Sequence, residues 1–290
     1  MAGVLDFIFS RDKKRYGGYK LLDEVARGGM SRVWTAKKPG EDKLYAVKVL
    51  TPESVEAMNR FKEVFETEEG EIALRLNHPN VIKTYGYGHT SKGGYFIVME
   101  YVDGPNLETL VVLESDRTVA NRFELVLQMG AGLEYIHQQG LIHRDFCPKN
   151  VLYGTDSVAK IIDFGLCVPT VVQERTFMGR AGTASYMAPE QVRSQPLDIR
   201  ADIYAYGMSA FEVLTHRRPF PRTQSRGRRM QDHLNIQPLR LRQVSPELPV
   251  ELEEVVEKCI AKDREMRYKS MDVVMRDMRA AVEIALSQQE

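Results

Sequence analysis

Hydrophobic positions follow two different periods, and the change between them divides the chain into two parts. Before residue 104, the apolar residues form short runs bounded by turn residues, as is typical of strands. Residues 19–25 and 31–36 flank the Gly28-Gly29 pair and predict a hairpin, and residues 44–50 predict a third strand after the turn at Pro39-Gly40. This part is therefore predicted to be a small sheet.

One segment of the first part has helical periodicity instead. Within residues 54–76, five apolar side chains fall in a narrow arc when the chain turns by about 100° per residue. They are Met58, Phe61, Phe65, Ile72 and Leu76. The sequence predicts one long helix here.

Beyond the turn at Asp103-Gly104-Pro105, helical stripes dominate. They cover residues 123–136, 203–214, 252–260 and 273–286, and Ser270 is in the right place to be the N-cap of the last helix. We therefore predict an α+β protein with an N-terminal extension (residues 1–18), a smaller strand-rich lobe (19–102) and a larger, mainly helical lobe (103–290).

Charge and cysteine content exclude several functional classes. The 40 basic and 40 acidic residues cancel, which argues against a partner such as nucleic acid or anionic lipid. No run reaches the ~18 apolar residues of a membrane helix. The three cysteines, Cys147, Cys167 and Cys259, are unpatterned, so we expect reduced thiols and a cytoplasmic location.

Three features of the first part hint at phosphate binding, although each also has a simpler interpretation. Residues 25–34 match only part of the G-x-G-x-x-G-x-V phosphate loop, with Ala26, Gly28 and Ser31 at the glycine positions and Val33 after them. Lys48 shares a strand face with Ala46 and could reach a phosphate or point into solvent. Glu68 and Glu69 both border the apolar arc, and periodicity alone does not decide which of them would pair with Lys48.

The strongest chemical signal is a set of three motifs in the second part. His143-Arg144-Asp145 is followed by Asn150, Asp163-Phe164-Gly165 comes 18 residues after Asp145, and Ala188-Pro189-Glu190 follows. Phosphoryl transfer needs a base, metal ligands and cationic clamps, and these motifs supply the first two.

With these motifs, residues 19–286 resemble the eukaryotic-type protein kinases, most of all the bacterial serine/threonine kinases. The resemblance implies the bilobal kinase fold, ATP and Mg²⁺ (with Mn²⁺ as an alternative) and protein substrates. It leaves the oligomeric state open, a dimer included.

The resemblance also implies roles for individual residues. Asp145 would be the base, Asn150 and Asp163 the metal ligands, and Lys48 the phosphate clamp, with Glu69 as its partner. Asp202 would brace the catalytic loop, and Glu190 would pair with Arg267. The residues implied around the nucleotide are Ala26, Gly28, Val33, Ala46, Met99, Glu100, Val102 and Leu152. Arg144 would bind a phosphorylated residue of the 163–190 segment, with Thr176 preferred to Thr170.

Three departures from the family pattern leave alternatives open. Two loop glycines are missing, so a pseudokinase that binds nucleotide without phosphoryl transfer is an alternative. A small-molecule phosphotransferase is a second alternative, but the complete segment that ends at Glu190 argues against it, because in the family that segment positions a peptide. Cys147 stands where serine/threonine kinases carry a lysine; it is either packing or a reactive thiol. Lys149, two residues later, could supply the missing cation or select substrates. The absence of that lysine also removes one of the marks of serine/threonine specificity, so tyrosine specificity is an alternative.

A run of arginines has no family role. Arg217, Arg218, Arg222, Arg226, Arg228 and Arg229 are accompanied by no acid within residues 217–229. We expect an exposed loop, either simply solvated or docking acidic or phosphorylated partners.

Overall fold

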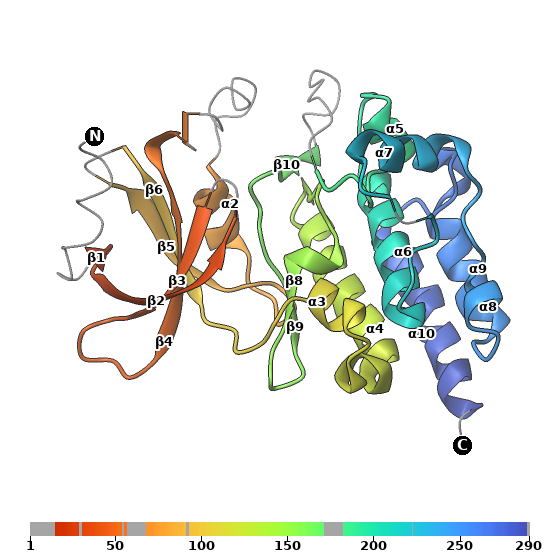
Figure 1. Ribbon diagram of the computed structural model, residues 1–290, viewed down its shortest axis with the longest axis horizontal. Helices are drawn as coiled ribbons and strands as arrows, with labels where there is room; N and C mark the ends of the chain where they lie inside the picture. Colours follow the sequence, from red (N-terminus) through yellow and green to blue (C-terminus); the bar gives the residue numbers. More distant parts are fainter. Residues whose placement is uncertain are drawn as a thin grey trace. The chain divides into compact units, whose positions relative to one another are not determined.

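The computed structural model describes residues 15–28, 31–53, 55–56, 68–90, 93–170, 182–221 and 223–288 (Figure 1). They form two compact units. One contains the described residues up to Arg75 together with Lys83–Val102, and the other contains Leu76–Ile82 and everything described from Asp103 onward. Leu76–Ile82 belongs with the second unit because the Ile82 N–H donates to the Ile161 carbonyl at 2.9 Å. None of the described helices has the length and apolar character needed to cross a bilayer.

The first unit is built on a six-stranded antiparallel sheet in the order β1-β2-β3-β4-β6-β5. The strands are β1 (Arg15–Tyr16), β2 (Tyr19–Arg27), β3 (Ser31–Lys37), β4 (Leu44–Leu50), β5 (Thr84–His89) and β6 (Tyr95–Glu100). The three predicted strands are confirmed as β2, β3 and β4. Their inward side chains form a core with those of β6, including Leu21, Ala36, Val47 and Val98.

Helix α2 (Glu69–Arg75) packs on β5 and contacts Tyr95 of β6. The prediction of one helix over residues 54–76 is wrong in its bounds, because Glu68 and Leu76 lie outside α2. Ile72 and the following Leu76 are buried, as the apolar arc predicts, whereas Met58, Phe61 and Phe65 lie outside the described residues. Gly70 permits the close approach, because a Cβ there would come within 2.4 Å of the Tyr95 hydroxyl. Its N–H donates to that hydroxyl at 2.9 Å. A side chain at position 70 would push the helix away from the sheet.

The second unit is mainly helical. Its helices are α3 (Leu107–Val112), α4 (Asp116–Gln138), α5 (Pro189–Val192), α6 (Arg200–Thr215), α7 (Arg226–Asn235), α8 (Leu241–Val244), α9 (Val250–Cys259) and α10 (Met271–Ser287), with 3-10 turns η1 (Pro148–Asn150) and η3 (Arg264–Met266). The four predicted stripes are confirmed as α4, α6, α9 and α10. Ser270 is the N-cap of α10, but its side chain makes no capping hydrogen bond.

Helix α6 is the centre of this unit and is buried from Ala201 to Leu214. It packs against α4 and α9, and α10 packs against the same two helices. Gly207 allows the contact with α9, because a Cβ there would lie 2.5 Å from the Cys259 side chain. Short antiparallel pairs, β7 (Leu141–Ile142) with β10 (Val168–Pro169) and β8 (Val151–Tyr153) with β9 (Ala159–Ile161), carry the loops of the site.

The prediction of an exposed loop for the arginine run is only partly right: Arg217, Arg226 and Arg228 are exposed, but part of the run is helical, and Arg222 lies outside the described residues. Arg226, Arg228 and Arg229 lie in the first turns of α7. Arg218 is paired with two acids that are far away in sequence, Glu108 and Glu212. Residues 217–229 contain no acid near Arg218 in sequence because its acidic partners lie on other helices, Glu108 on α3 and Glu212 on α6.

Candidate active site

Strand pairing gathers five of the predicted nucleotide-site residues on one face of the sheet. Ala26 lies opposite Val33, and Val33 lies opposite Lys48. Ala46, two residues before Lys48, lies opposite Met99. Cross-strand partners project to the same side of a sheet, as do residues two apart on a strand. Of these five residues, four have apolar side chains and Lys48 carries a positive charge.

Lys48 is held in place by an acid from α2. Its Nζ donates to Glu69 Oε1 at 2.7 Å, and both side chains are largely buried. Glu68 instead contacts His89 Nε2 at 2.9 Å. Periodicity left Glu68 and Glu69 equivalent, the family resemblance favoured Glu69, and the structure confirms Glu69 as the partner of the lysine. A buried pair of this kind fixes the ammonium group in position.

Three further predicted residues lie at turns or at the end of the sheet. The Gly28 N–H donates to the Ser31 carbonyl at 2.8 Å and closes the hairpin turn; residues 29 and 30 lie outside the described part of the chain. The Glu100 N–H donates to the Lys83 carbonyl at 2.9 Å. The backbone N–H of Glu100 is therefore already used within the sheet, and its carbonyl oxygen is the atom that could accept a hydrogen bond from an adenine amine. Val102 ends the first unit and is half-buried.

In the second unit, Asp145 is oriented by two neighbours. The Thr183 N–H donates to Asp145 Oδ1 at 2.6 Å. Asn150 Nδ2 donates to the Asp145 carbonyl at 2.9 Å and to Oδ2 at 3.2 Å. Burial raises the pKa of Asp145, and the Thr183 hydrogen bonds oppose that rise. A fixed carboxylate with a raised pKa is suited to accept a proton.

Asp202, on α6, anchors the loop that carries Asp145. Its two oxygens accept the backbone N–H groups of His143 and Arg144 at 2.7 and 2.8 Å, and Oδ2 also lies 2.9 Å from His137 Nε2. Burial by itself would raise the pKa of Asp202, but the hydrogen bond and charge of His137 outweigh it and lower the pKa. These hydrogen bonds to Asp202 hold Arg144 at φ 67°, a backbone conformation that residues other than glycine rarely adopt.

Pairing of β8 with β9 brings Asn150 and Asp163 to the same end of a hairpin. The Ile162 N–H donates to the Asn150 carbonyl at 2.9 Å, and Asp163 follows with φ 68°. Leu152 lies in β8 opposite Lys160. The strained backbone at Asp163 persists because the hairpin and the neighbouring turn determine it.

The donors available at this end fit a magnesium ion that arrives with a nucleotide. The Asn150 amide nitrogen is used on Asp145, so its oxygen is the atom that can bind a metal, beside the Asp163 carboxylate. No cluster of three or more His, Cys, Asp or Glu side chains that could hold a metal occurs in the described part of the chain. Mg²⁺ characteristically takes one or two protein oxygens and completes its shell with phosphates and water.

The segment containing Thr183 is tied to the helical unit by a buried ion pair. Arg267 donates from Nη1 and Nη2 to the two oxygens of Glu190, at 2.7 and 2.8 Å. Both side chains are almost fully buried. The pair predicted between these residues is thus present, and it fixes the end of the segment that positions Asp145.

Comparison with known proteins identifies this arrangement. The protein kinase domain family matches residues 19–278. The chain belongs to the protein kinase family. The predicted α+β kinase fold, with a small antiparallel sheet and a larger helical part, is therefore confirmed.

Several bacterial kinases resemble this kinase domain over most of its length. A probable serine/threonine-protein kinase of Streptomyces coelicolor is 32% identical over 94% of this chain and 41% of its own. The serine/threonine-protein kinase PknB of Mycobacterium leprae is 32% identical over 90% of this chain and 42% of its own. The serine/threonine-protein kinase PknH of Mycobacterium tuberculosis is 33% identical over 90% of this chain and 41% of its own. The chain spans about two fifths of the length of these relatives.

The kinase domain departs from its family pattern at Cys147, and the structure decides between the two interpretations of that thiol. Cys147 is 0% exposed, its Sγ lies 3.8 Å from Thr183 Oγ1, and burial raises its pKa to about 12. A buried, protonated thiol is a poor nucleophile. The reactive-thiol interpretation is therefore wrong, and Cys147 is a packing residue beside the base. Cys167 and Cys259 are buried as well.

Of the predicted regulatory residues and Lys149, the structure describes Lys149, Arg144 and Thr170. Lys149 is exposed on η1, next to Asn150. Arg144 is buried, and its Nη1 donates to the Leu166 carbonyl at 3.5 Å. The Thr170 N–H donates to the Gly140 carbonyl at 2.8 Å. Thr176 lies outside the described residues.

Sequence reasoning missed two features of the site. The Thr183 N–H positions Asp145, and a backbone donor is not revealed by the type of residue that carries it. Gln191 Nε2 donates to the Arg144 carbonyl at 3.0 Å and supports the same loop. An isolated glutamine before a helical stripe carries no signal of this role.

Proposed function

We propose that this chain is the catalytic domain of a serine/threonine protein kinase that transfers the γ-phosphoryl group of ATP to protein hydroxyl groups. The observation that carries the proposal is the Asp145 carboxylate, held by Thr183 and Asn150 on a loop anchored by Asp202. The names of the relatives, all serine/threonine-protein kinases, support the choice of acceptor.

Each polar residue of the site has a distinct role in this proposal. Asp145 accepts the proton of the attacking serine or threonine hydroxyl. Asn150 and Asp163 hold Mg²⁺, or Mn²⁺ in its place, on the ATP phosphates. Lys48, fixed by Glu69, stabilises the α- and β-phosphates. Phosphoryl transfer depends mainly on such positioning and charge stabilisation.

The apolar face of the sheet and the strand end supply the adenine site. Val33, Ala46 and Leu152 would contact the base, and Ala26 at the end of β2, Gly28 in the hairpin turn and Met99 in β6 would contact the nucleotide. Glu100 and Val102 offer backbone hydrogen bonds. A cytoplasmic location and protein substrates complete the proposal.

A transfer assay separates this proposal from a pseudokinase and from a small-molecule phosphotransferase. Radiolabelled ATP and Mg²⁺ are added with a generic protein substrate, and in parallel with small hydroxyl compounds such as sugars and amino alcohols. We expect label on protein serine or threonine alone. ATP binding without transfer would establish a pseudokinase, transfer only to the small compounds would establish the other enzyme, and label on tyrosine would overturn the acceptor assignment.

Lys149→Ala is expected to lower turnover about 10²-fold with little change in ATP affinity, because Lys149 would supply the cation that the lysine at position 147 supplies in the family. Cys147→Lys in the same chain is expected to restore part of the rate. Steady-state kinetics on matched neutral and basic peptides test this. Normal turnover on the neutral peptide, with a gain on the basic one, would assign Lys149 to substrate selection instead.

Thr176 is expected to be autophosphorylated, with Thr170 as the second choice, because a phosphate in this segment could pair with the Arg144 guanidinium and order the segment. Mass spectrometry of ATP-treated protein locates the modification. Protein carrying Asp145→Asn is the control for phosphorylation by another enzyme. If neither threonine is modified in active protein, the prediction fails.

A further inference from the structure

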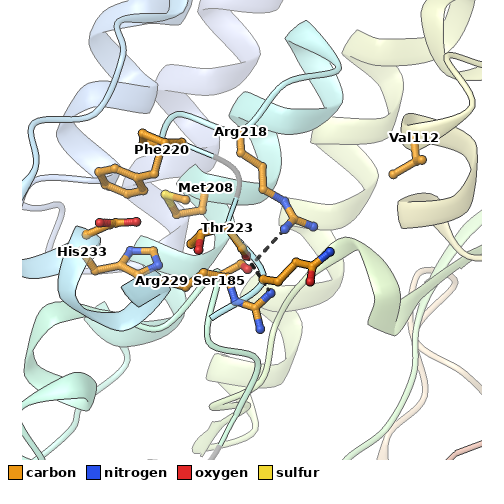
Figure 2. A pocket seen from close by; sticks show the side chains of 11 residues that line it. Val112, Ser185, Met208, Arg218, Phe220, Thr223, Arg229 and His233 are labelled. Carbon is orange, nitrogen blue, oxygen red and sulfur yellow. Dashed lines mark hydrogen bonds between the residues drawn. The ribbon is translucent and has the colours of Figure 1, made fainter. Parts of the chain in front are cut away.

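A cavity of about 390 Å³ opens beside the segment that carries Thr183. Its lining includes Ser185, two residues after Thr183, and three residues from the region between α6 and the first turns of α7: Arg218, Thr223 and Arg229. Figure 2 shows the guanidinium groups of Arg218 and Arg229 on either side of Ser185. The proposed mechanism leaves all four residues without a role.

Arg218 is a fixed cation in the wall of this cavity. Its guanidinium lies 3.0 Å from Glu212 Oε1 and 3.0 Å from Glu108 Oε1, and Nη1 donates to Ser185 Oγ at 3.2 Å. Glu212 is buried at 1% exposure and also accepts the Tyr186 hydroxyl. The single charge of Arg218 therefore offsets one of the two carboxylates that it contacts and reduces their repulsion of an anion in this cavity.

Among the described residues that line the cavity, Arg229 is a cation without an ion-pair partner. Its Nε is buried without a hydrogen-bond partner, and its Nη1 makes only a long contact, 3.4 Å, to the Thr223 carbonyl. Within the ranges that the structure describes, no carboxylate lies within 4 Å of its guanidinium. A buried guanidinium N–H left unpaired is unfavourable, and a carboxylate or phosphate is its best-matched partner.

The other ionisable groups of the cavity do not supply that partner. Burial lowers the pKa of His233 to about 4, so this histidine is neutral near pH 7, and its Nδ1 lies 2.7 Å from the Tyr204 hydroxyl. Asp232 also lines the cavity but forms no ion pair with Arg229. Burial lowers the pKa of Lys262, and the negative charge of Asp232 opposes that change. Asp232 therefore interacts electrostatically with Lys262.

We propose that this cavity binds an acidic or phosphorylated side chain of the protein substrate, with Arg229 as the charged partner and Ser185 as a neutral donor. The proposal rests on the proposed kinase function. Thr183 contacts Asp145 directly, and two residues of chain span at most about 7 Å. The anionic residue is therefore expected within about three or four residues of the hydroxyl that is phosphorylated.

The test uses peptides with one acceptor serine and an alanine, glutamate, phosphoserine or arginine placed in turn at each of the four positions before and after it. We expect one register at which glutamate or phosphoserine raises kcat/KM about ten- to a hundredfold over alanine, as hydrogen bonds to a charged group would. A gain with phosphoserine alone would indicate recognition of pre-phosphorylated substrates. A gain with both would indicate recognition of acidic segments.

Two substitutions locate the preference. Arg229→Gln is expected to bring the ratio of kcat/KM for the anionic and alanine peptides close to one, and Arg229→Lys to keep part of it. Arg228→Gln, which removes the same charge from an exposed neighbour on α7, is expected to leave the ratio unchanged. Thermal unfolding of each variant checks that it is folded.

The outcomes separate this inference from the proposed function. Phosphorylation of the peptides with no anionic preference at any register would overturn the inference and leave the kinase assignment standing. A preference that survives Arg229→Gln, or that is lost equally in Arg228→Gln, would also overturn it. Absence of transfer to every peptide, alanine peptides included, would instead contradict the proposed function.

Discussion

Asp145→Asn is expected to lower the rate of phosphoryl transfer by about 10²–10⁴-fold while leaving ATP affinity nearly unchanged. An amide does not accept the proton of the attacking hydroxyl, which is the role proposed for this side chain. The amide oxygen can still accept the Thr183 N–H that now bonds to Asp145 Oδ1 at 2.6 Å, so the loop is expected to keep its shape. Steady-state kinetics with a protein substrate and nucleotide titration measure the two quantities.

Asp156→Asn is the matched control for this change. Asp156 lies at the turn between β8 and β9, where its Oδ1 accepts the Val158 N–H at 3.2 Å, and it has no role in the proposed chemistry. Turnover is expected to be unchanged in this variant. If Asp145→Asn retained full turnover, the assignment of Asp145 as the base would be overturned.

Arg267→Met is expected to lower the free energy of unfolding by about 3–5 kcal/mol, because it leaves the Glu190 carboxylate buried without its cation. Arg267 also donates to the carbonyls of Ala261, Arg200 and Lys262, at 2.7, 2.9 and 3.2 Å, so the loss extends beyond one pair. Urea unfolding followed by circular dichroism measures the change.

Lys269→Met tests whether burial is the reason for this effect. Lys269 pairs with Glu265 at 2.9 Å, but both side chains are more than half exposed, and such pairs contribute about 0–1 kcal/mol. The double change Glu190→Gln with Arg267→Met is expected to recover part of the stability, because no uncompensated charge stays buried. A loss below about 1 kcal/mol in Arg267→Met would contradict the anchoring role of the pair.

The sequence by itself determined where several of the regular elements lie and which chemistry the chain carries. Strand-length runs and helical stripes depend on neighbours a few residues apart, so residues 19–25, 31–36 and 44–50 predicted β2, β3 and β4 correctly. The spacing of Asp145, Asn150 and Asp163 was enough to indicate the kinase family, which the family match confirms.

Only the tertiary structure decided the pairings that neither periodicity nor the family motifs specify. Periodicity alone did not distinguish Glu69 from Glu68 as the partner of Lys48, 21 residues away, because it does not show which position of α2 faces the sheet. Arg218 pairs with Glu108 across 110 residues, a contact that the local run of arginines does not reveal. Cys147 was left open as a thiol next to the base until its burial was known. Hydrophobic periodicity reports which face of a single helix or strand is apolar, whereas ion pairs and burial depend on which elements the fold brings together.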